Sequence, residues 1–563
     1  MARTAQSILS QQLDQAASAC KGGWRVLRDH GPNAFQFWLI ALVIGVVAGF
    51  AAVLFRKGIS ALQSTLYGTE DVQQLHSFAE MLPWYLILII PIAGGLIVGL
   101  ILDRFTPDGR VRSVADVIEG AALRHGRVET RAGLASALAS FITLSSGGSS
   151  GREGPVVHMA GVISTWVCRR IDADGITGRD LLGCAVAAAV SASFNAPIAG
   201  ALFALEVVLR HFAVHAFAPI VIASVAGTVI SRLEFGDVAE FTLTTTPGAL
   251  QFYVELPAFL ILGLISGLIA VALMRSIFVA EDVASRIQSR SGIPRWLRPG
   301  IAGALLGIIA IFYPHIIGVG YETTRNALAG EMVLWNAIVF AVIKVVAVAI
   351  TIAGRMGGGV FSPSLMVGAL AGLGYGMIAT SIFPDVSGTH TLYAFAGMGA
   401  VAAAVLGAPI STTLIVFELT GDWQIGLAVM VSVSMSTALA SRLVDRSFFL
   451  TQLERRGIHL AAGPQAYLLA MFRVGSVMRK PDDPRAADPD ECWTMINNGT
   501  YVDVNATLEV AMPLFDRAMV PFVPVVSLTG DKGAPELRGA LFHLDALKAY
   551  NRALAATAAE EHS

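Results

Sequence analysis

Apolar stretches, many of them interrupted by Gly or Pro, alternate with short polar segments along most of this chain. The clearest of them, each interpreted as a membrane-spanning segment, are 37–54, 83–102, 259–273 and 301–312. Most apolar stretches are shorter than the about 20 residues that a perpendicular helix needs to cross a bilayer. Short, broken segments are typical of tilted, re-entrant or partial helices, whose free backbone groups must be covered by protein or water. The pattern therefore predicts an all-α integral membrane protein.

The apolar pattern also occurs twice, in the same order and at a nearly constant offset. The matching segments are Ile92–Gly95 with Ile301–Ala304, Gly151–Pro155 with Gly359–Pro363, Ala185–Val190 with Ala400–Val405, and Asn195–Glu206 with Gly407–Glu418. Four ordered matches indicate an internal duplication. The repeats are about 36–240 and 255–455, and the charged stretch 281–298 is interpreted as the link between them. Duplicated apolar halves are typical of membrane transporters whose substrate site lies between the halves.

Composition supports this class of protein. The chain is 55% hydrophobic and 14% charged, with a mean hydropathy of +0.65, whereas soluble domains carry about 25% charged residues. The net charge of −2 gives no reason to expect nucleic-acid binding. The four cysteines lie far apart without a CxxC pair, so neither a metal site nor a disulfide framework is expected. No catalytic or nucleotide-binding motif stands out among the scattered polar residues, so we expect no cofactor and no enzyme.

Changes in composition divide the chain into three parts. Residues 1–35 are polar, and Lys and Arg outnumber Asp and Glu there, which places them in the cytoplasm by the positive-inside rule. Residues 36–455 form the membrane domain. Residues 464–563 have the composition of a small soluble domain, which we place in the cytoplasm with the N-terminal segment.

The motif Gly151-Arg-Glu-Gly-Pro155 carries the first candidate chemistry. It follows a Ser/Gly-rich loop and precedes an apolar run, so it stands where a helix begins and leaves backbone N–H groups free. Free amides at a helix N-terminus bind anions. Glu153 can occupy the place of the anion and leave it when protonated or displaced. The alternative is a capping glutamate at an ordinary interfacial helix, although an acidic residue at membrane depth is costly and usually functional.

The motif Gly357-Gly-Gly-Val-Phe-Ser-Pro363 is its counterpart in the second half. It offers another Gly-rich turn, another Pro near a helix start, and free amides at Val360 and Phe361. Two helix N-termini aimed at one point would make an anion site with partial positive charge and no full cation. Glycines used only for packing are the alternative for either motif alone.

Together, these two motifs and the twice-used Ala-Pro-Ile…Glu segment resemble the CLC family of chloride channels and proton/chloride exchangers, over about residues 36–455. The resemblance implies two inverted repeats of tilted and partial helices, and a homodimer in which each subunit has its own anion pathway. Glu153 matches the family's gating glutamate. The amides of Gly154, Val360 and Phe361 match its anion-coordinating groups. Ser113 falls at its central serine, although the flanking Gly and Pro residues of the family are missing here.

Two further positions depart from the family. Phe449 aligns with its central tyrosine, so the ring is kept and the hydroxyl donor is lost. Val207 stands where the family's exchangers commonly have a proton-transfer glutamate, and valine carries no proton. The preceding Glu206 and its repeat partner Glu418 are either functional or structural partners of helix termini.

The C-terminal domain resembles a single, degenerate CBS module of α+β type. In a dimer each subunit would supply one copy. Phe542 stands three residues before Asp545, where nucleotide-binding members usually have Ser or Thr, so a dimer-supporting role is expected in place of nucleotide binding.

The resulting hypothesis is passive, gated chloride conduction in a bacterial plasma (inner) membrane, by a multi-pass protein with both termini in the cytoplasm. The alternative is a proton-coupled chloride exchanger that uses the same anion pathway. A fluoride-exporting variant is also open, but the intact Gly-Arg-Glu-Gly-Pro motif and Ser113 fit chloride better.

Overall fold

The computed structural model describes residues 34–69, 74–212, 214–236, 252–458, 460, 469, 472–504, 506–527 and 535–562. Nearly all of the predicted cytoplasmic segment 1–35 and the start of the 464–563 domain lie outside these residues. The described residues form two compact units. Those of the first fall within Met1–Ala121, Gly126–Leu209 and Ala218–Gly457, and those of the second within Ala122–His125, Arg210–Phe217 and Ile458–Ser563.

The first unit is helical throughout the described residues. Its helices are α2 (Ala34–Tyr67), α3 (Leu75–Glu80), α4 (Trp84–Phe105), α5 (Val114–Leu123), α6 (Thr130–Ser145), α7 (Glu153–Ile171), α8 (Gly175–Phe194), α9 (Pro197–Phe203), the π-helix η2 (Ala204–Leu209), α10 (Val214–Phe235), α11 (Phe252–Ser291), η3 (Arg295–Leu297), α12 (Arg298–Phe312), η4 (Pro314–Ile316), α13 (Tyr321–Ala329), α14 (Leu334–Ala353), α15 (Phe361–Ile382), α16 (His390–Leu406), α17 (Pro409–Thr420), α18 (Trp423–Leu443) and α19 (Phe448–Glu454).

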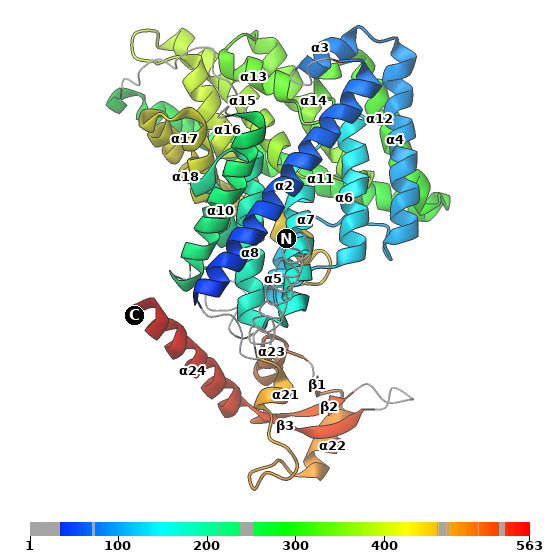
Figure 1. The fold of residues 1–563 in the computed structure, drawn as a ribbon, viewed down its shortest axis with the longest axis vertical. Helices are drawn as coiled ribbons and strands as arrows, with labels where there is room; N and C mark the ends of the chain where they lie inside the picture. The colour runs from blue at the N-terminus through cyan, green and yellow to red at the C-terminus, as the bar shows by residue number, and fades with distance from the viewer. Residues whose placement is uncertain are drawn as a thin grey trace, which may run out of the picture. The chain divides into compact units, whose positions relative to one another are not determined.

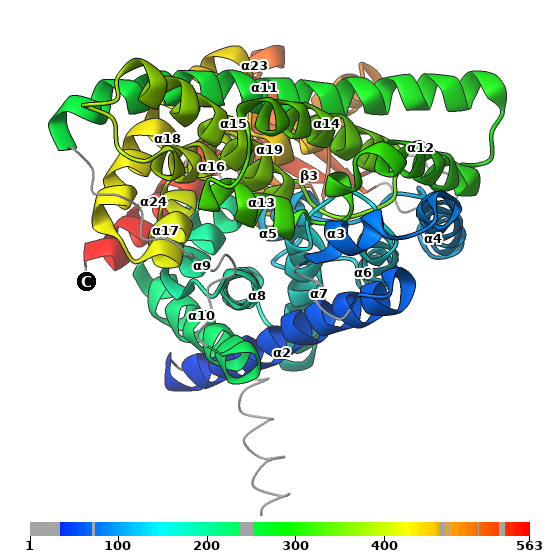
Figure 2. The same ribbon diagram turned by 90° about the horizontal axis from the view of Figure 1, so that it is seen from above.

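Eight helices of the described chain are long and apolar enough to cross a membrane. The four segments predicted from the sequence lie in α2, α4, α11 and α12, so these predictions are confirmed. Figure 1 shows α2 inclined against the steeper α4 and α6, and Figure 2 shows α2 and α11 along opposite edges of the unit. Apolar helices too short to span are present too, and they are Pro197–Leu209, His390–Leu406 and Pro409–Thr420. Long apolar helices and shorter apolar ones are therefore both present, and the tilt and inverted repeats stay a prediction.

The duplicated segments fall on equivalent helices. The matching segments Ile92–Gly95 and Ile301–Ala304 lie on α4 and α12. These two helices pack against each other through faces that carry glycine. A Cβ atom added at Gly95 would collide with the Pro299 carbonyl, and one added at Gly303 would collide with the Pro91 carbonyl. Small residues allow such close backbone approach between membrane helices.

The stretch 281–298, interpreted above as the link between the halves, lies inside the second repeat as bounded above and is largely helical. Helix α11 continues through it to Ser291, and only a short turn separates it from η3. Most residues at this end of α11 are exposed. Its Glu and Arg residues have a high helix propensity, so the helix continues here without an apolar face to bury. Gly292 ends the helix at φ +66°, and Pro294 follows.

The second unit contains a three-stranded sheet and short helices. Its elements are α21 (Val474–Val477), α22 (Pro489–Asn497), β1 (Val502–Asp503), α23 (Leu508–Ala518), β2 (Phe522–Ser527), β3 (Glu536–Phe542) and α24 (His543–His562). The strand order is β1-β2-β3, with β1 parallel and β3 antiparallel to β2. Strand β2 is buried along its whole length and packs with Leu508 and Phe515 of α23. The α+β character expected for this domain is present, and the likeness to a CBS module stays a prediction.

Candidate anion site

The two Gly-rich motifs meet at the starts of α7 and α15. Gly151 and Gly359 exchange both of their backbone hydrogen bonds, N–H to O=C, at 2.7 Å in each direction. The Ser150 hydroxyl adds a bond to the Gly357 carbonyl at 3.1 Å. Helix α7 begins at Glu153 and α15 at Phe361, so each motif is a loop that enters a helix. Segments 208 positions apart thus form one paired structure.

Glycine is required in the second of these loops. Gly357 and Gly358 have φ angles of +110° and +106°, which side chains disfavour. A Cβ atom at Gly358 would also collide with the Ser150 hydroxyl. At the first loop, a Cβ atom at Gly154 would lie 3.3 Å from the Cα atom of Gly359. The helix starts are therefore held as close as backbone atoms allow.

A cavity of about 440 Å³, including its open part, lies between these helix starts. It gathers every residue that the sequence proposed for anion binding or gating, namely Ser113, Glu153, Gly154, Val360, Phe361 and Phe449. Apolar side chains make up most of the remaining wall, and they are Val114, Val157, Phe203, Ile352 and Phe448. The structure brings the residues together, and their roles stay a prediction.

Glu153 lies between the two helix starts. Its side chain is 2% exposed, and its Oε1 accepts a hydrogen bond from the Ser362 hydroxyl at 2.5 Å. Glu153 is in the first turn of α7, and Ser362 is in the first turn of α15. The carboxylate therefore occupies a place where two helix N-termini favour negative charge. Ser362 was not among the predicted site residues, although its position equivalent to Gly154 in the repeat could have singled it out.

Ser113 is positioned by charged residues in place of the Gly and Pro that the family uses. The Ser113 N–H donates to Asp116 at 2.9 Å, which caps the start of α5. The Arg112 side chain is 4% exposed and donates to Asp108 and Glu129 at distances from 2.9 to 3.0 Å. Burial raises the pKa of Asp108, but the bonds from Arg110 and Arg112 outweigh it and hold that pKa below its usual value.

Helix α19 forms another part of the cavity wall. Phe449 is 3% exposed and packs edge-on against Phe448, with ring centroids 5.8 Å apart. Gln452, which no sequence motif singled out, also lines the cavity. Val207 does not line it and lies 5% exposed in the π-helix η2.

The two repeat-related glutamates each cap a helix of the other half. Glu206 accepts bonds from the Ile410 and Ser411 N–H groups at 2.9 and 2.7 Å, and another from the Ser411 hydroxyl at 2.7 Å. Glu418 accepts bonds from the Ile198 and Ala199 N–H groups at 3.0 and 2.8 Å. The structural alternative for these residues, pairing with helix termini, is confirmed.

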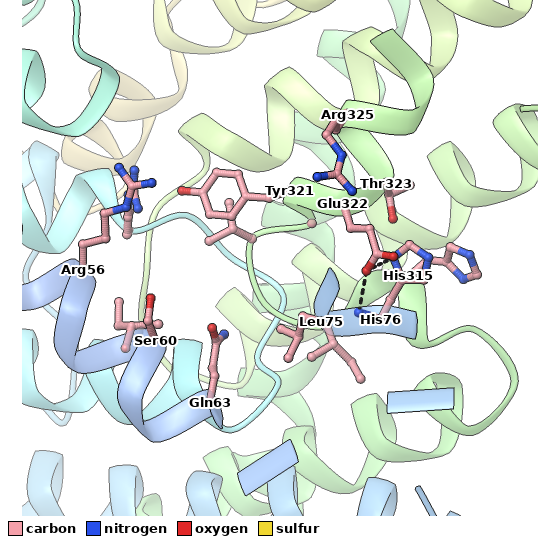
Figure 3. A pocket seen from close by; sticks show the side chains of 15 residues that line it. Arg56, Ser60, Gln63, Leu75, His76, His315, Tyr321, Glu322, Thr323 and Arg325 are labelled. Atoms are coloured by element: carbon pink, nitrogen blue, oxygen red, sulfur yellow. Dashed lines mark hydrogen bonds and ion pairs between the residues drawn. The ribbon is translucent and has the colours of Figure 1, made fainter. Parts of the chain in front are cut away.

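A second cavity of about 850 Å³ lies on the other side of the Arg152–Glu153 step. Arg152 lines this cavity, whereas the next residue, Glu153, lines the first one. Figure 3 shows Arg56, Arg325 and Tyr321 lining this second cavity. Arg152 lies over the Tyr321 ring at 5.2 Å and donates to the Ser193 carbonyl at 2.9 Å. Neighbouring residues of the chain thus line the two cavities.

An acidic residue and two histidines fix one wall of this second cavity, as Figure 3 shows. Glu322 accepts a bond from the His76 backbone N–H at 2.9 Å and lies 2.9 Å from its Nδ1 atom. Burial raises the pKa of Glu322, but the bonds from His76 and Ser77 lower it below its usual value. The His315 ring stacks on His76 at 4.2 Å. Among the described residues, no group of three His, Cys, Asp or Glu side chains is placed to hold a metal ion.

Comparisons with known proteins agree with this fold. The family model described as "Voltage gated chloride channel" matches residues 94–441. The chain is 31% identical over 398 residues to the "Putative chloride channel protein ClcB-like" of Ralstonia nicotianae, covering 70% of this chain and 91% of the relative. It is 28% identical over 428 residues to the voltage-gated ClC-type chloride channel ClcB of Escherichia coli, covering 74% and 98%.

Solved structures are similar in fold at lower identity. A slow cyanobacterial Cl⁻/H⁺ antiporter has a TM-score of 0.64 at 21% identity, covering 75% of this chain and 97% of its own. A eukaryotic CLC transporter has a TM-score of 0.64 at 18% identity, covering 90% and 97%. A CLC-type fluoride/proton antiporter has a TM-score of 0.60 at 19% identity, covering 73% and 97%. At these identities the likeness concerns the fold alone.

Proposed function

Because the chain belongs to the voltage-gated chloride channel family, we propose that it conducts chloride passively through the cavity between the starts of α7 and α15. Glu153 is the gate in this proposal. The observation that carries it is the burial of one carboxylate, bonded to Ser362, between two helix N-termini that favour anions.

The anion contacts follow from the lining of the cavity. Amides at the helix starts, at Gly154, Val360 and Phe361, supply partial positive charge, and Ser113 supplies a hydroxyl. Such a site contains no full cation, so it binds an anion without holding it too firmly for conduction. When Glu153 is protonated or moves aside, chloride takes its place. The second cavity, reached across Arg152, is the approach on the other side of the gate.

The second candidate function is proton-coupled chloride exchange through the same cavity. Two of the structural neighbours are called antiporters, whereas the sequence relatives are called channels. Val207 favours passive conduction, because it follows Glu206 at the position where the family's exchangers commonly have a proton-transfer glutamate, and valine cannot carry a proton. The fluoride/proton antiporter among the neighbours also makes fluoride a second anion to test.

Flux from liposomes with recorded external pH separates these functions. Chloride release under a potassium and valinomycin clamp, without stoichiometric proton movement, is the expected result. Uphill proton movement driven by chloride would replace passive conduction by exchange. The Glu153→Gln variant should lose most of the pH dependence of flux, while exposed Glu331→Gln should keep it. Unchanged pH dependence in Glu153→Gln would remove the gate assignment.

From the resemblance we also propose a homodimer with inverted repeats in a bacterial plasma membrane, with cytoplasmic termini. The second unit is proposed to support the dimer without binding a nucleotide. The Asp545 carboxylate already accepts a bond from Arg479 at 2.6 Å, and Arg479 lies over the Phe542 ring at 3.9 Å. Deleting residues 464–563 should therefore leave anion selectivity intact and weaken dimers measured by cross-linking.

A further inference from the structure

We propose that the side-chain amide of Gln452 is a hydrogen-bond donor to the anion at the wall of the cavity formed by α19. This inference deepens the proposed function and rests on it, because it takes the cavity to be the anion pathway. It names a residue that determines how strongly the α19 wall of the cavity binds chloride.

The first argument is position. Gln452 and Phe449 are three residues apart on α19, so their side chains share a face of that helix. Both line the cavity, together with Ser113. Phe449 presents only a hydrocarbon ring to it. Gln452 therefore adds a polar group to a wall that is otherwise aromatic.

The second argument is chemistry. Among the lining residues, the polar side chains are those of Ser113, Glu153 and Gln452. Ionised Glu153 repels an anion, which leaves one hydroxyl and one amide as neutral side-chain donors. A glutamine amide carries two N–H donors and no charge. It suits a site that must release its anion as readily as it binds it.

The third argument is the unmet hydrogen bonding of this amide. The Gln452 Oε1 atom is buried and has no hydrogen-bond partner among the described residues. Buried polar groups nearly always have a partner, and an exception calls for a ligand, an ion or water. The oxygen and nitrogen of a glutamine amide exchange places by a rotation of the terminal torsion. As an oxygen, the unpartnered atom calls for a donor, but with the amide turned by half a turn the same position carries the NH₂ group, a donor that suits an anion.

The test uses the full-length protein. It removes the hydrogen-bond donor at position 452 and adds a donor at the neighbouring position 449. Gln452→Leu removes the amide at similar size, Phe449→Tyr adds a hydroxyl, and the third variant combines both. Thr451→Val is the matched control, because Thr451 is polar, belongs to α19 and does not line the cavity. Chloride binding is measured by titration calorimetry on purified protein, and chloride flux is measured from liposomes.

We expect Gln452→Leu to weaken chloride binding about 3- to 10-fold, the effect of one neutral hydrogen bond. Thr451→Val should bind chloride as the unchanged protein does. Phe449→Tyr should restore the affinity of Gln452→Leu to within about 2-fold, because the hydroxyl replaces the missing donor. If Gln452→Leu is poorly folded, Gln452→Met provides the same comparison with an unbranched side chain.

Two results would overturn the inference. One is unchanged chloride affinity in both the Leu and the Met variants. The other is a loss of affinity that Phe449→Tyr does not restore, which would assign Gln452 a purely structural role. If the unchanged protein neither binds nor conducts chloride, the proposed function itself fails. If it does both with a Glu153-dependent pH response, a negative result at Gln452 concerns this inference alone.

Discussion

In each half of the membrane unit, a glutamate caps a helix of the other half. Substituting these glutamates tests how much the caps contribute to the stability of the unit. Glu418 closes the start of α9, and Glu206 closes the start of α17, each through backbone N–H groups. We consider Glu418→Gln and Glu206→Gln. Each change removes a negative charge and one acceptor oxygen while keeping the size of the side chain.

The magnitude follows from the bonds. Hydrogen bonds to a charged group contribute about 1.5–3 kcal/mol each, and neutral ones about 0.5–1.5 kcal/mol. In Glu418→Gln one charged bond is lost, the other becomes neutral, and one N–H group faces the new NH₂ group. The favourable interaction with the helix dipole is lost as well. Since both carboxylates are only half-buried, we take the lower end and expect a loss of about 2 kcal/mol.

Glu206→Gln should cost about the same. Its extra partner, the Ser411 hydroxyl, can rotate to accept a bond from the new amide, so a charged bond is exchanged there for a neutral one and the cost is slightly higher. A loss at both positions is therefore a specific consequence of the repeat-related geometry.

Thermal unfolding of the purified protein in detergent measures these effects. One kcal/mol shifts the midpoint by about 2–4 °C in chains of 150–250 residues, and by less in a chain of 563 residues. We expect a fall of roughly 2–4 °C for each variant. Glu331→Gln, at an exposed position, is the control and should leave the midpoint unchanged. Midpoints of both variants equal to the control would refute the stabilising role, and a shift in only one would refute the symmetry argument.

Three further changes have clear expected outcomes. Gly303→Ala should abolish folded protein in size-exclusion chromatography, because its Cβ atom meets the backbone of α4, whereas Gly374→Ala has room and should elute normally. Burial and the neighbouring His76 lower the pKa of His315 from 6.5 to about 4. Between pH 6.5 and 4 the imidazole is therefore protonated in the unfolded state but not in the folded state, so the free energy of unfolding should fall as the pH is lowered through this range. The free energy of unfolding should change by at most about 1.4 kcal/mol per pH unit, and by less because this ring is partly exposed. The unfolding midpoint of His315→Phe should therefore depend less on pH than that of the unchanged protein. Arg479→Met should lower the unfolding midpoint of the second unit by removing the bond to Asp545, and an unchanged midpoint would contradict that.

The residues around the cavity could be predicted because they belong to short motifs with a physical signature. A Gly-rich turn, a Pro near a helix start and a carboxylate between them at Glu153 are visible without a structure. The repeat supplied the second motif and with it Val360 and Phe361. These residues lie around one cavity because the two loops pair through Gly151 and Gly359.

The remaining parts depended on packing that has no local pattern. Gln452 belongs to no motif, and its place at the cavity depends on where α19 packs, although its helical spacing of three residues from the predicted Phe449 was a usable signal. The bond of Arg112 to Glu129 also connects separate loops. Helix α11 extends beyond its apolar stretch on an exposed, charged surface, where hydrophobic periodicity gives no signal.

The pairing of Gly151 with Gly359 has a consequence for the order of events on the ribosome. At about 5–20 residues per second, roughly 10–40 s pass between the synthesis of the two glycines. During this interval the loop that contains Glu153 has no partner segment to pair with, and its backbone amides stay unpaired. A nascent chain stopped between these positions should therefore be more sensitive to membrane proteases than one stopped just after α15. Any inserted segment that delays the second half prolongs this exposed stage.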